Sequence, residues 1–515
     1  MSPAPVRVGV ALSGGVDSAV AALFLQRCVP LWRDVEALWS MTRPMSLGVV
    51  RDALEERRSC SEIGVRASVA RARHDPAAAV HYFPLFMKNW EDVAEGGDQR
   101  WCEAAQREYN DATDVARSVG LLQGDEMLPL HNYSACYVEK CFEPMLSAYA
   151  RGATLNVDVL CNAEVKFDAL LRSLLATGNA QYLATGHYAR TVAFPHNESD
   201  NTTARRVGIA RPFSARRDLN DQTVFLSRLS QFQTARAVFP LGHVFEQKTD
   251  VRAVAAHFGL TQVSAKKTST GLCFVGNRYR NAARGGGSGF STFLEEYISP
   301  NDAMLRRLTA EGKQTIFVDA ETNSVVETSQ LVLMGECCQP LLPAYSLTLG
   351  QMIRGKSKDG ATARYYVQGK ELFAVQRCEE KEQEEHVRYL RTVRLVDRWD
   401  HPLLYAMVAE LRDVLLTVPP HWFSEKRASD VQLRCHCCAR HQDSLRPATM
   451  CFAWSNLRDE AADGCIRVSH ASVMFDEPVR ALTTGQALVA YGSLTRDGAV
   501  GDAAEWFVLA SGWIA

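Results

Sequence analysis

The sequence lacks long hydrophobic runs. No stretch of about 18 consecutive apolar residues occurs, so no membrane-spanning helix is expected. The first predicted strand begins at Val6, which leaves no room for a signal or transit peptide of ordinary length. Of the 515 residues, 47% are hydrophobic and 23% are charged, which is typical of a globular chain of two to four domains.

An excess of charge of one sign is also missing, and cysteine is sparse. The net charge is −2, so a nucleic-acid site would need a local basic patch. Fifteen cysteines are too few for a disulfide scaffold in a chain of this length. Most of them are therefore expected to be buried thiols in a reducing compartment.

The stretch RVGVALSGGVDSAV, residues 7–20, joins a predicted strand to a predicted helix. It is not a P-loop, because no Gly-Lys-Ser/Thr follows. Gly14 and Gly15 let the backbone approach a phosphate and adopt positive φ. A helix that begins at Asp17 directs free N–H groups to the same place. The pattern predicts a pyrophosphate site, in which Asp17 meets Mg²⁺ or caps the helix.

The segment S-G-G-V-D-S resembles the loop of ATP pyrophosphatases, enzymes that split ATP between the α and β phosphates and adenylate an oxygen of the acceptor. The alternative is an ordinary strand-to-helix turn with a Ser or Asp cap. The loop alone does not name the acceptor, because amide-forming, urea-forming and sulfur-inserting enzymes would all carry it.

The order of the predicted elements gives the architecture. Strands alternate with helices up to about residue 213, which predicts an α/β domain with a parallel sheet. Residues 29–80 look like a partly helical, partly mobile insertion whose arginines form a solvated face; an RNA-touching arm is the alternative. Residues 214–284 read as a domain of short helices. Residues 285–515 read as a β-barrel domain with insertions, in which 379–395 is a charged helix or loop.

Two cysteines have unusual neighbours. Cys161, in NVDVLCNAEVKF, precedes a predicted helix, where a thiol has a lowered pKa, and Asp158 could shuttle a proton to it. Cys273, in KKTSTGLCFVG, follows Lys266 and Lys267, which also favour a thiolate. Each alone reads as structural. As a pair, one thiol can carry a persulfide and the other can resolve it.

Eight motifs in this order resemble the tRNA-specific 2-thiouridylases, bacterial and mitochondrial. They are SGGVDS (13–18), FMKNWED (86–92), NVDVLCNAEVKFDALL (156–171), ATGHYAR (184–190), NDQTVFLSRL (220–229), FPLGH (239–243), STGLCFVG (269–276) and MFDEPVRALTTGQALVAY (474–491). Three positions depart from the family: Val157 replaces a proline, Asn220 replaces a lysine, and LGQMIRGKSKDG (349–360) replaces a GQR-K-G segment.

The resemblance implies an N-terminal PP-loop domain of the adenine-nucleotide alpha-hydrolase type, a small central domain and a C-terminal β-barrel, arranged around tRNA. The family converts a wobble uridine of tRNA to 2-thiouridine with ATP, Mg²⁺ and persulfide sulfur from a donor protein. A monomer is expected. Eukaryotic members are mitochondrial, so a mitochondrial location is expected, with a cytoplasmic one as the alternative.

The resemblance also assigns residues. ATP would contact Ala11, Leu12, Ser13, Gly14, Gly15, Val16, Asp17, Ser18, Met87 and Gly186. Cys161 would be the nucleophile and Cys273 the persulfide carrier. Asn156, Val157 and Asp158 would face the target base, and tRNA would contact His187, Asn220, Asp221, Gln222, Arg364, Tyr365 and Gln486. Lys266 and Lys267 are expected to contribute a local basic set on the tRNA backbone.

Two rival functions remain open. One is a PP-loop enzyme with a different acceptor, which would need no cysteine pair. The other is a tRNA-binding homologue without catalysis, which intact Ser13, Asp17, Cys161 and Cys273 disfavour. The segment RCHCCARH, 434–441, with Cys451, could bind zinc, but the alternation of its residues favours a barrel strand.

Overall fold

The computed structural model describes residues 3–63, 74–90, 99–194, 207–213, 220–266, 294, 297, 315–323, 325–326, 347–356, 362–377, 387–418, 430–453, 457–458, 465–493 and 506–515. Cys273 and Lys267 lie outside these ranges. Within the described residues, no helix has the length and apolar character needed to cross a membrane.

The first sheet has five strands, all parallel, in the order β3-β2-β1-β4-β7. Their bounds are β1 Val6–Ala11, β2 Val80–Lys88, β3 Leu130–Asn132, β4 Tyr182–Ala184 and β7 Ala237–Val238. The central strand β1 is apolar at nearly every position, as expected for a strand covered on both faces. This sheet confirms the predicted α/β class.

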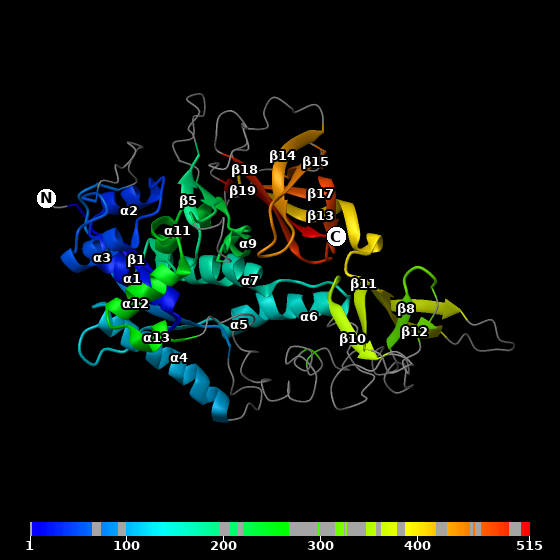
Figure 1. Cartoon of the computed structure of the whole chain (residues 1–515). Coiled ribbons are helices and arrows are strands. Elements are labelled where there is room, and N and C mark those ends of the chain that lie inside the picture. Colours follow the sequence, from blue (N-terminus) through cyan, green and yellow to red (C-terminus); the bar gives the residue numbers. More distant parts are fainter. Residues whose placement is uncertain are drawn as a thin grey trace.

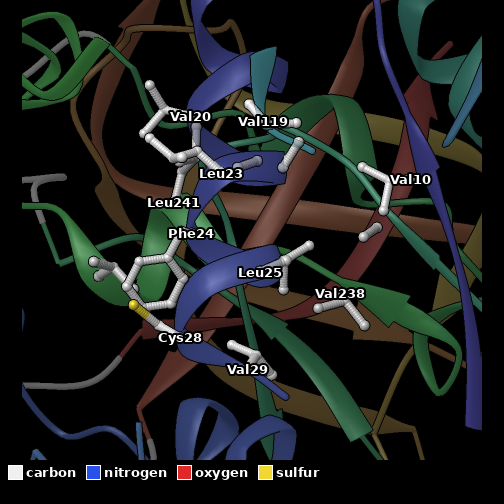
Figure 2. Close-up of a cluster of buried hydrophobic side chains, with 14 of the residues drawn as sticks. Val10, Val20, Leu23, Phe24, Leu25, Cys28, Val29, Val119, Val238 and Leu241 are labelled. Carbon is white, nitrogen blue, oxygen red and sulfur yellow. The ribbon is translucent and has the colours of Figure 1, made fainter. Parts of the chain in front are cut away.

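Helix α1 (Val16–Cys28) packs along this sheet and is buried on almost all sides. Its interior has no glycine or proline, and small alanines alternate with large apolar residues, so neighbouring elements approach it closely. Figure 2 shows Val20, Leu23, Phe24 and Leu25 of α1 among side chains from β1, β7 and α11. This rigid core fixes the position of the loop that precedes α1.

The helices around the first sheet come from distant parts of the chain. They are α2 (Trp32–Trp39), α3 (Leu47–Glu56), α4 (Gln99–Ser118), α9 (Thr223–Leu226), α10 (Gln231–Thr234), α11 (Pro240–Val244), α12 (Lys248–His257) and α13 (Thr261–Ser264). Helix α12 lies against α1, and β7 is hydrogen-bonded to β4. Residues 237–257 therefore build onto the N-terminal layer; the domain boundaries at 213 and 284 stay a prediction.

The predicted insertion is part of the core where it is described. Trp32 of α2 is fully buried and packs against Tyr182 of β4, with ring centroids 4.8 Å apart. Helix α3 buries Val50, Ala53 and Leu54. The expectation of a largely solvated segment is wrong for α2 and α3, because apolar residues at helical spacing in each helix pack into the core.

A long helical segment links the two halves of the molecule (Figure 1, cyan). It comprises α5 (Ser134–Tyr137), the π-helix η1 (Val138–Phe142) and α6 (Glu143–Ala150). A second helical run comprises α7 (Val157–Leu160), the π-helix η2 (Cys161–Leu170) and α8 (Leu171–Ala176). The second run begins at Val157, earlier than predicted.

A second five-stranded sheet lies at the far end of α6, in the order β10-β11-β12-β8-β9. Its strands are β8 Thr315–Asp319, β9 Val325–Val326, β10 Met352–Lys356, β11 Thr362–Arg377 and β12 Val387–Val396. Strand β12 corrects the predicted charged helix or loop over the part that the structure describes, residues 387–395: Arg394 stands between Val393 and Leu395, which are buried.

The C-terminal third closes into an antiparallel barrel of six strands, in the order β13-β17-β15-β14-β18-β19, with β19 returning to β13. The bounds are β13 Tyr405–Leu416, β14 Val431–Cys438, β15 Arg446–Phe452, β17 Ile466–Arg480, β18 Ala487–Ser493 and β19 Trp506–Ile514. Strand β16 (Leu457–Arg458) pairs with β17. The predicted barrel is confirmed.

A hairpin from the N-terminal half joins this barrel. Strands β5 (Arg190–Ala193) and β6 (Val207–Ala210) pair with each other, and Ala210 pairs with Phe507 of β19. The hairpin follows β4 directly in the chain. The barrel is thus attached close to the end of a strand of the first sheet.

Candidate functional site

The candidate site lies at one edge of the first sheet. Its five strands are parallel, so their carboxyl ends share this edge, where open α/β sheets bind ligands. The loop 12–15 follows β1, Asn89 follows β2, and Gly186 and His187 follow β4. The sequence motifs at 13–18, 86–92 and 184–190 therefore meet in space.

The two glycines of the loop have different conformations. Gly14 has φ +67°, and a Cβ there would lie 2.7 Å from the main-chain oxygen of Glu108, so only glycine fits. Gly15 is extended, with φ −100°, and its Cβ would meet only Ser13 Oγ at 3.4 Å. The protein itself thus requires glycine at position 14 but leaves open space at position 15.

The N-terminus of α1 is open to a ligand. No side chain caps it among the described residues. Ser18 instead turns back, donating to the Gly15 carbonyl at 3.0 Å and accepting from the Ser13 N–H at 3.2 Å. An uncapped helix start behind a glycine turn suits an anionic group.

Gly186 brings the end of β4 against this helix start. A Cβ at Gly186 would lie 2.6 Å from the Ser18 nitrogen and 2.7 Å from the Asp17 carbonyl carbon. The two loops are therefore in backbone contact, and a larger residue at position 186 would push them apart. This contact places Gly186 beside the loop, as the predicted ATP set requires.

Asp17 is paired rather than free. One carboxylate oxygen accepts from Tyr188 Oη at 2.8 Å, and the other lies 3.0 Å from Lys248 Nζ. On the other side of the loop, Lys266 Nζ donates to the Gly14 carbonyl at 2.9 Å and forms an ion pair with Asp111. The structure thus places Lys266 against the loop. Tyr188 and Lys248 were missed by sequence reasoning, since they lie 171 and 231 residues away.

Cys161 reaches the same edge through Asn89. The Asn89 side-chain nitrogen lies 3.7 Å from Cys161 Sγ, at hydrogen-bond distance for sulfur. The side-chain oxygen of Asn89 is buried and has no hydrogen-bond partner within the described part of the chain. Met87 and Cys161 also border the same apolar cluster.

The expected activation of Cys161 by a helix N-terminus is not found. The helix begins four residues earlier at Val157, so Cys161 is the first residue of the π-helix η2. Burial raises the pKa of the Cys161 thiol, Lys166 lowers it, and Asp158 and Cys136 raise it further. At neutral pH, the thiol form is therefore favoured in this structure.

The residues before Cys161 form the start of α7. The side chain of Asn156 accepts from the Asp158 N–H at 3.0 Å, which caps the helix, and Val157 is buried. Burial raises the pKa of Asp158, while Lys166 and His441 lower it. A carboxyl with a raised pKa is suited to proton transfer.

His187 lies between the sheet edge and η2. Its Nδ1 is 2.7 Å from Thr185 Oγ1, and its ring is 6.0 Å from that of Phe239 and 6.2 Å from that of Phe167. Burial, together with Lys166, lowers the pKa of His187 well below its usual value. The imidazole is therefore neutral at physiological pH.

Several predicted tRNA contacts are engaged inside the protein. Asp221 forms an ion pair with Arg211 at 2.5 Å and accepts from Thr223. Gln222 accepts from the Tyr188 N–H at 2.9 Å, and Gln486 of the barrel donates to the Thr154 carbonyl at 2.7 Å. These side chains position the segments that carry Tyr188 and Asn156.

Arg364 and Tyr365 lie on β11 in the second sheet, opposite Arg354 and Ile353 of β10. Arg364 is exposed, whereas Tyr365 packs at the border of the apolar cluster that also contains Cys161. Asn220 is half-buried at the start of its motif. The sequence gives no signal that β11 lies near Cys161. Both border an apolar cluster that residues of α5, η1 and α6 help to form.

Ten cysteines of the described residues are free thiols, among them Cys136, Cys141 and Cys161. Cys136 and Cys141 share the apolar cluster with Cys161, and Cys161 contributes to raising the pKa of Cys141. No disulfide is therefore present among the described cysteines. Any pairing of Cys161 with Cys273 concerns a residue outside the described ranges.

The segment 434–441 is a barrel strand and its following turn. Cys435 and Cys437 face the buried side of β14, with sulfurs 3.6 Å apart, and His436 packs against Trp506. His441 instead stacks on Phe225 of α9, with ring centroids 4.5 Å apart. No group of three potential metal ligands occurs within the described ranges.

This fold and site define a class: an α/β protein that presents a glycine turn and an uncapped helix start to an anionic ligand, with a thiol at the same sheet edge. The family model of the tRNA methyl transferase HUP domain matches residues 59–277. The chain is 31% identical over 407 residues to the tRNA-specific 2-thiouridylase MnmA of Neisseria gonorrhoeae, covering 79% of this chain and 84% of the relative.

Two further relatives extend the match. The tRNA-specific 2-thiouridylase MnmA of Burkholderia thailandensis is 31% identical over 421 residues, with 82% and 86% coverage. That of Bacillus licheniformis is 29% identical over 492 residues, with 95% and 92% coverage. The chain therefore belongs to the tRNA-specific 2-thiouridylase family, and it is an enzyme on that ground.

Proposed function

We propose that this chain is a tRNA-uridine 2-sulfurtransferase: it adenylates the C2 oxygen of the wobble uridine with ATP and then replaces that oxygen with sulfur from a cysteine persulfide. The products are 2-thiouridine, AMP and pyrophosphate. The observation that carries the proposal is the meeting of the 13–18 loop and Cys161, through Asn89, at one edge of one sheet.

The loop fits a nucleotide phosphate. Gly14 shapes the turn, Gly15 leaves space for a close approach, and the uncapped α1 supplies N–H groups. ATP supplies the adenylyl group that turns the uracil oxygen into a leaving group. Asp17 lies within the 13–18 motif and would hold Mg²⁺, although Lys248 and Tyr188 occupy its oxygens here.

The sulfur step assigns roles to two thiols. A persulfide on Cys273, loaded by a donor protein, would attack C2 with its terminal sulfur. AMP leaves with the former C2 oxygen, and the Cys161 thiolate then attacks Cys273 Sγ, forming a disulfide and breaking the original S–S bond. Alternatively, Cys161 first releases hydrosulfide, which then attacks C2. Either route needs Cys161 and Cys273 to come within disulfide-bonding distance.

The predicted partners and setting belong to the same proposal. tRNA would contact His187, Arg364 and the segment around Asn156, with Lys267 on its backbone. We propose a monomer in mitochondria, with the cytoplasm as the alternative. The finer roles of these residues rest on the resemblance of their motifs.

A labelled persulfide donor tests the paired-thiol mechanism. Cys273→Ser should block loading of labelled sulfur onto the protein while tRNA-dependent AMP release persists. Cys161→Ser should load sulfur but fail to transfer it. Cys451→Ser, at a barrel cysteine far along the chain, is the matched control and should load and transfer normally. Label on tRNA at the wild-type rate in either single variant would refute the mechanism.

The same assay separates the rival functions. An enzyme with a different acceptor would release AMP without tRNA and would keep full activity after Cys161→Ser. A homologue without catalysis would release no AMP under any condition. tRNA-dependent AMP release by the wild-type chain excludes both.

A further inference from the structure

The nitrogen and the oxygen of the Asn89 side-chain amide have different surroundings. It follows β2 at the carboxyl edge of the sheet, two residues after Met87, and its side chain is half-buried. The amide nitrogen points to Cys161 Sγ at 3.7 Å. The amide oxygen is shielded from solvent and finds no donor in the described part of the protein.

A buried acceptor without a donor is unfavourable, and native structures rarely retain one without a reason. Because the amide nitrogen is directed to the sulfur, the polar atom of the carboxamide that is left without a partner is the oxygen, which can only accept. The group that completes this site must therefore carry a hydrogen-bond donor. It must also approach the sulfur, since the oxygen and nitrogen of one amide are bonded to the same carbon.

The two pyrimidines differ at this point. Uracil carries an N–H at N3, whereas cytosine has a lone pair there, and N3 is bonded to C2 in both bases. A donor at N3 that meets the Asn89 oxygen would place the neighbouring C2 beside Cys161. The arrangement thus combines selection of the base with placement of the reacting carbon.

We propose that Asn89 is the specificity-determining residue for uridine: its side-chain oxygen accepts from N3–H of the target base, while its nitrogen holds the Cys161 sulfur next to C2. This inference rests on the proposed function and names the base that the site accepts. Because the oxygen is shielded from solvent, the contact requires the surroundings of Asn89 to rearrange when the base binds.

The contact belongs to the complex that forms before adenylation. When the C2 oxygen bonds to the AMP phosphorus, the N3–H bond breaks and its electron pair forms the C2=N3 double bond, so that the ring stays neutral. Asp158, at the start of the helix that carries Cys161, is a group that can take this proton. Asn89 should therefore influence which base binds and is adenylated, and not the loading of sulfur onto the protein.

Binding of anticodon hairpins tests the inference without any catalysis. The full chain is titrated with three RNA hairpins that carry uridine, cytidine or 3-methyluridine at the wobble position. The wild-type chain should bind the uridine hairpin at least about 10-fold more tightly than the other two, because only uridine satisfies the buried acceptor. Asn89→Ala should reduce both ratios to about one, and Asn89→Asp, which keeps an acceptor, should retain a preference for uridine.

Asn132→Ala is the matched control. Asn132 ends β3 at the same sheet edge, but its side-chain oxygen already accepts from the Ser134 N–H at 3.0 Å and the Ser134 hydroxyl at 2.7 Å. The ratios should be unchanged in this variant. Circular dichroism and thermal melting establish that each variant is folded, and the 3-methyluridine arm tests the wild-type chain without any substitution.

Equal affinity of the wild-type chain for all three hairpins, or unchanged ratios in Asn89→Ala, would overturn the inference. A preference for cytidine would also overturn it, because it would mean that the amide presents its nitrogen to the base. Formation of 2-thiouridine is measured separately on full tRNA with ATP and a persulfide donor. If the binding preference is present and no thionucleoside forms, the proposed function fails while the recognition of uridine stands.

Discussion

Gly14 and Gly15 are adjacent in the loop before α1, but the fold requires glycine only at position 14. Gly14 is held in a left-handed conformation against the Glu108 carbonyl, whereas Gly15 is extended and meets nothing closer than Ser13 Oγ at 3.4 Å. The first glycine therefore serves the fold. The second leaves a space that the fold does not use, which is what a ligand site requires.

Substitution by alanine separates these two roles. Gly14→Ala should lower the free energy of unfolding by about 1–3 kcal/mol, because of positive φ and the close main-chain oxygen. Gly15→Ala should change it by less than about 0.5 kcal/mol but abolish AMP release, because the new Cβ occupies the phosphate position. Urea titration and AMP release are measured on both. A stable Gly15→Ala variant with wild-type AMP release would contradict the assignment of the phosphate site.

Cys161 illustrates how burial competes with charge at one residue. Its pKa is raised by burial, raised further by Asp158 and lowered by Lys166. We predict that alkylation of Cys161 by iodoacetamide speeds up as the pH rises from 7 to 10, since the thiolate is the reactive form. Asp158→Asn should speed alkylation at pH 8, and Lys166→Gln should slow it.

Peptide mass spectrometry measures the alkylation of Cys161 separately, with the half-buried Cys136 as an internal reference. Opposite effects of the two variants follow from the opposite signs of the charges. Equal effects of both, or faster alkylation in Lys166→Gln, would contradict the electrostatic account. In that case, access through the surrounding chain would control the reaction.

At the scale of single elements, two histidines from different elements are withdrawn from solvent: His187 follows β4, and His243 lies in α11. His243 of α11 accepts from the Thr191 N–H of β5 at 3.1 Å, and its Nδ1 is buried without a partner among the described residues. Burial lowers the pKa of His243 and of His187 well below the usual value. Both rings are therefore neutral in the folded chain near pH 6.

This shift predicts a pH dependence of stability. At a pH between the usual histidine pKa of 6.5 and the lower pKa values of the folded chain, the unfolded chain binds more protons than the folded chain. The free energy of unfolding is therefore highest above pH 6.5 and decreases as the pH falls below it. Each histidine should contribute about 1.4 kcal/mol per pH unit to this loss. Urea titrations from pH 7 to 5 measure the slope.

The variant His243→Asn should reduce the slope of unfolding free energy against pH by the amount that corresponds to about one bound proton, even if it lowers stability at every pH. His257→Asn is the matched control: His257 is partly exposed and paired with Glu55, so it should not remove this destabilising slope. An unchanged slope in His243→Asn would show that His243 is protonated in the folded chain.

The elements themselves could be predicted where local pattern decides them. The sequence predicts the strand before Ser13 and the barrel strand around Cys435, and the structure confirms both. Helix α7 begins at Val157, before the helix that the sequence predicts after Cys161, and Asn156 caps it. The π-helical conformation after Cys161 has no signal in the sequence.

The site could be predicted only in part for a different reason. A sequence motif identifies residues that are close together in the chain. The motifs therefore predict the 13–18 loop, Cys161 and Gly186 as site residues. The partners Lys248, Tyr188 and His441 depend on which distant segments pack together. Asn89 lies inside a quoted motif, but the contact of its amide nitrogen depends on the position of Cys161, 72 residues away.

At the scale of the whole molecule, a buried arginine connects the two halves. Arg228 follows α9, and its guanidinium donates to the main-chain carbonyl of Asp413 on β13 at 2.8 Å and lies over the Trp513 ring. The Arg228 side chain is 9% exposed, whereas that of Asp413 is 57% exposed. Ser511 Oγ donates to the neighbouring Ser227 carbonyl at 2.9 Å.

The asymmetry in burial predicts an asymmetry in energy. Arg228→Ala should lower the free energy of unfolding by about 2 kcal/mol, because it removes buried packing and leaves a main-chain carbonyl without its donor. Asp413→Asn should cost less than about 1 kcal/mol, since an exposed ion pair contributes little and asparagine tolerates the φ of +48° at that position. Equal losses in the two variants would show that the ion pair itself holds the barrel to the first domain.

The most direct test of the account is the nucleoside composition of tRNA after reaction. Unmodified tRNA is incubated with the full chain, ATP, Mg²⁺ and a persulfide donor, digested, and analysed by mass spectrometry alongside AMP release. The account predicts one 2-thiouridine per AMP with the wild-type chain, and AMP release without 2-thiouridine with Cys161→Ser. AMP release by the wild-type chain with no 2-thiouridine in the tRNA would contradict it.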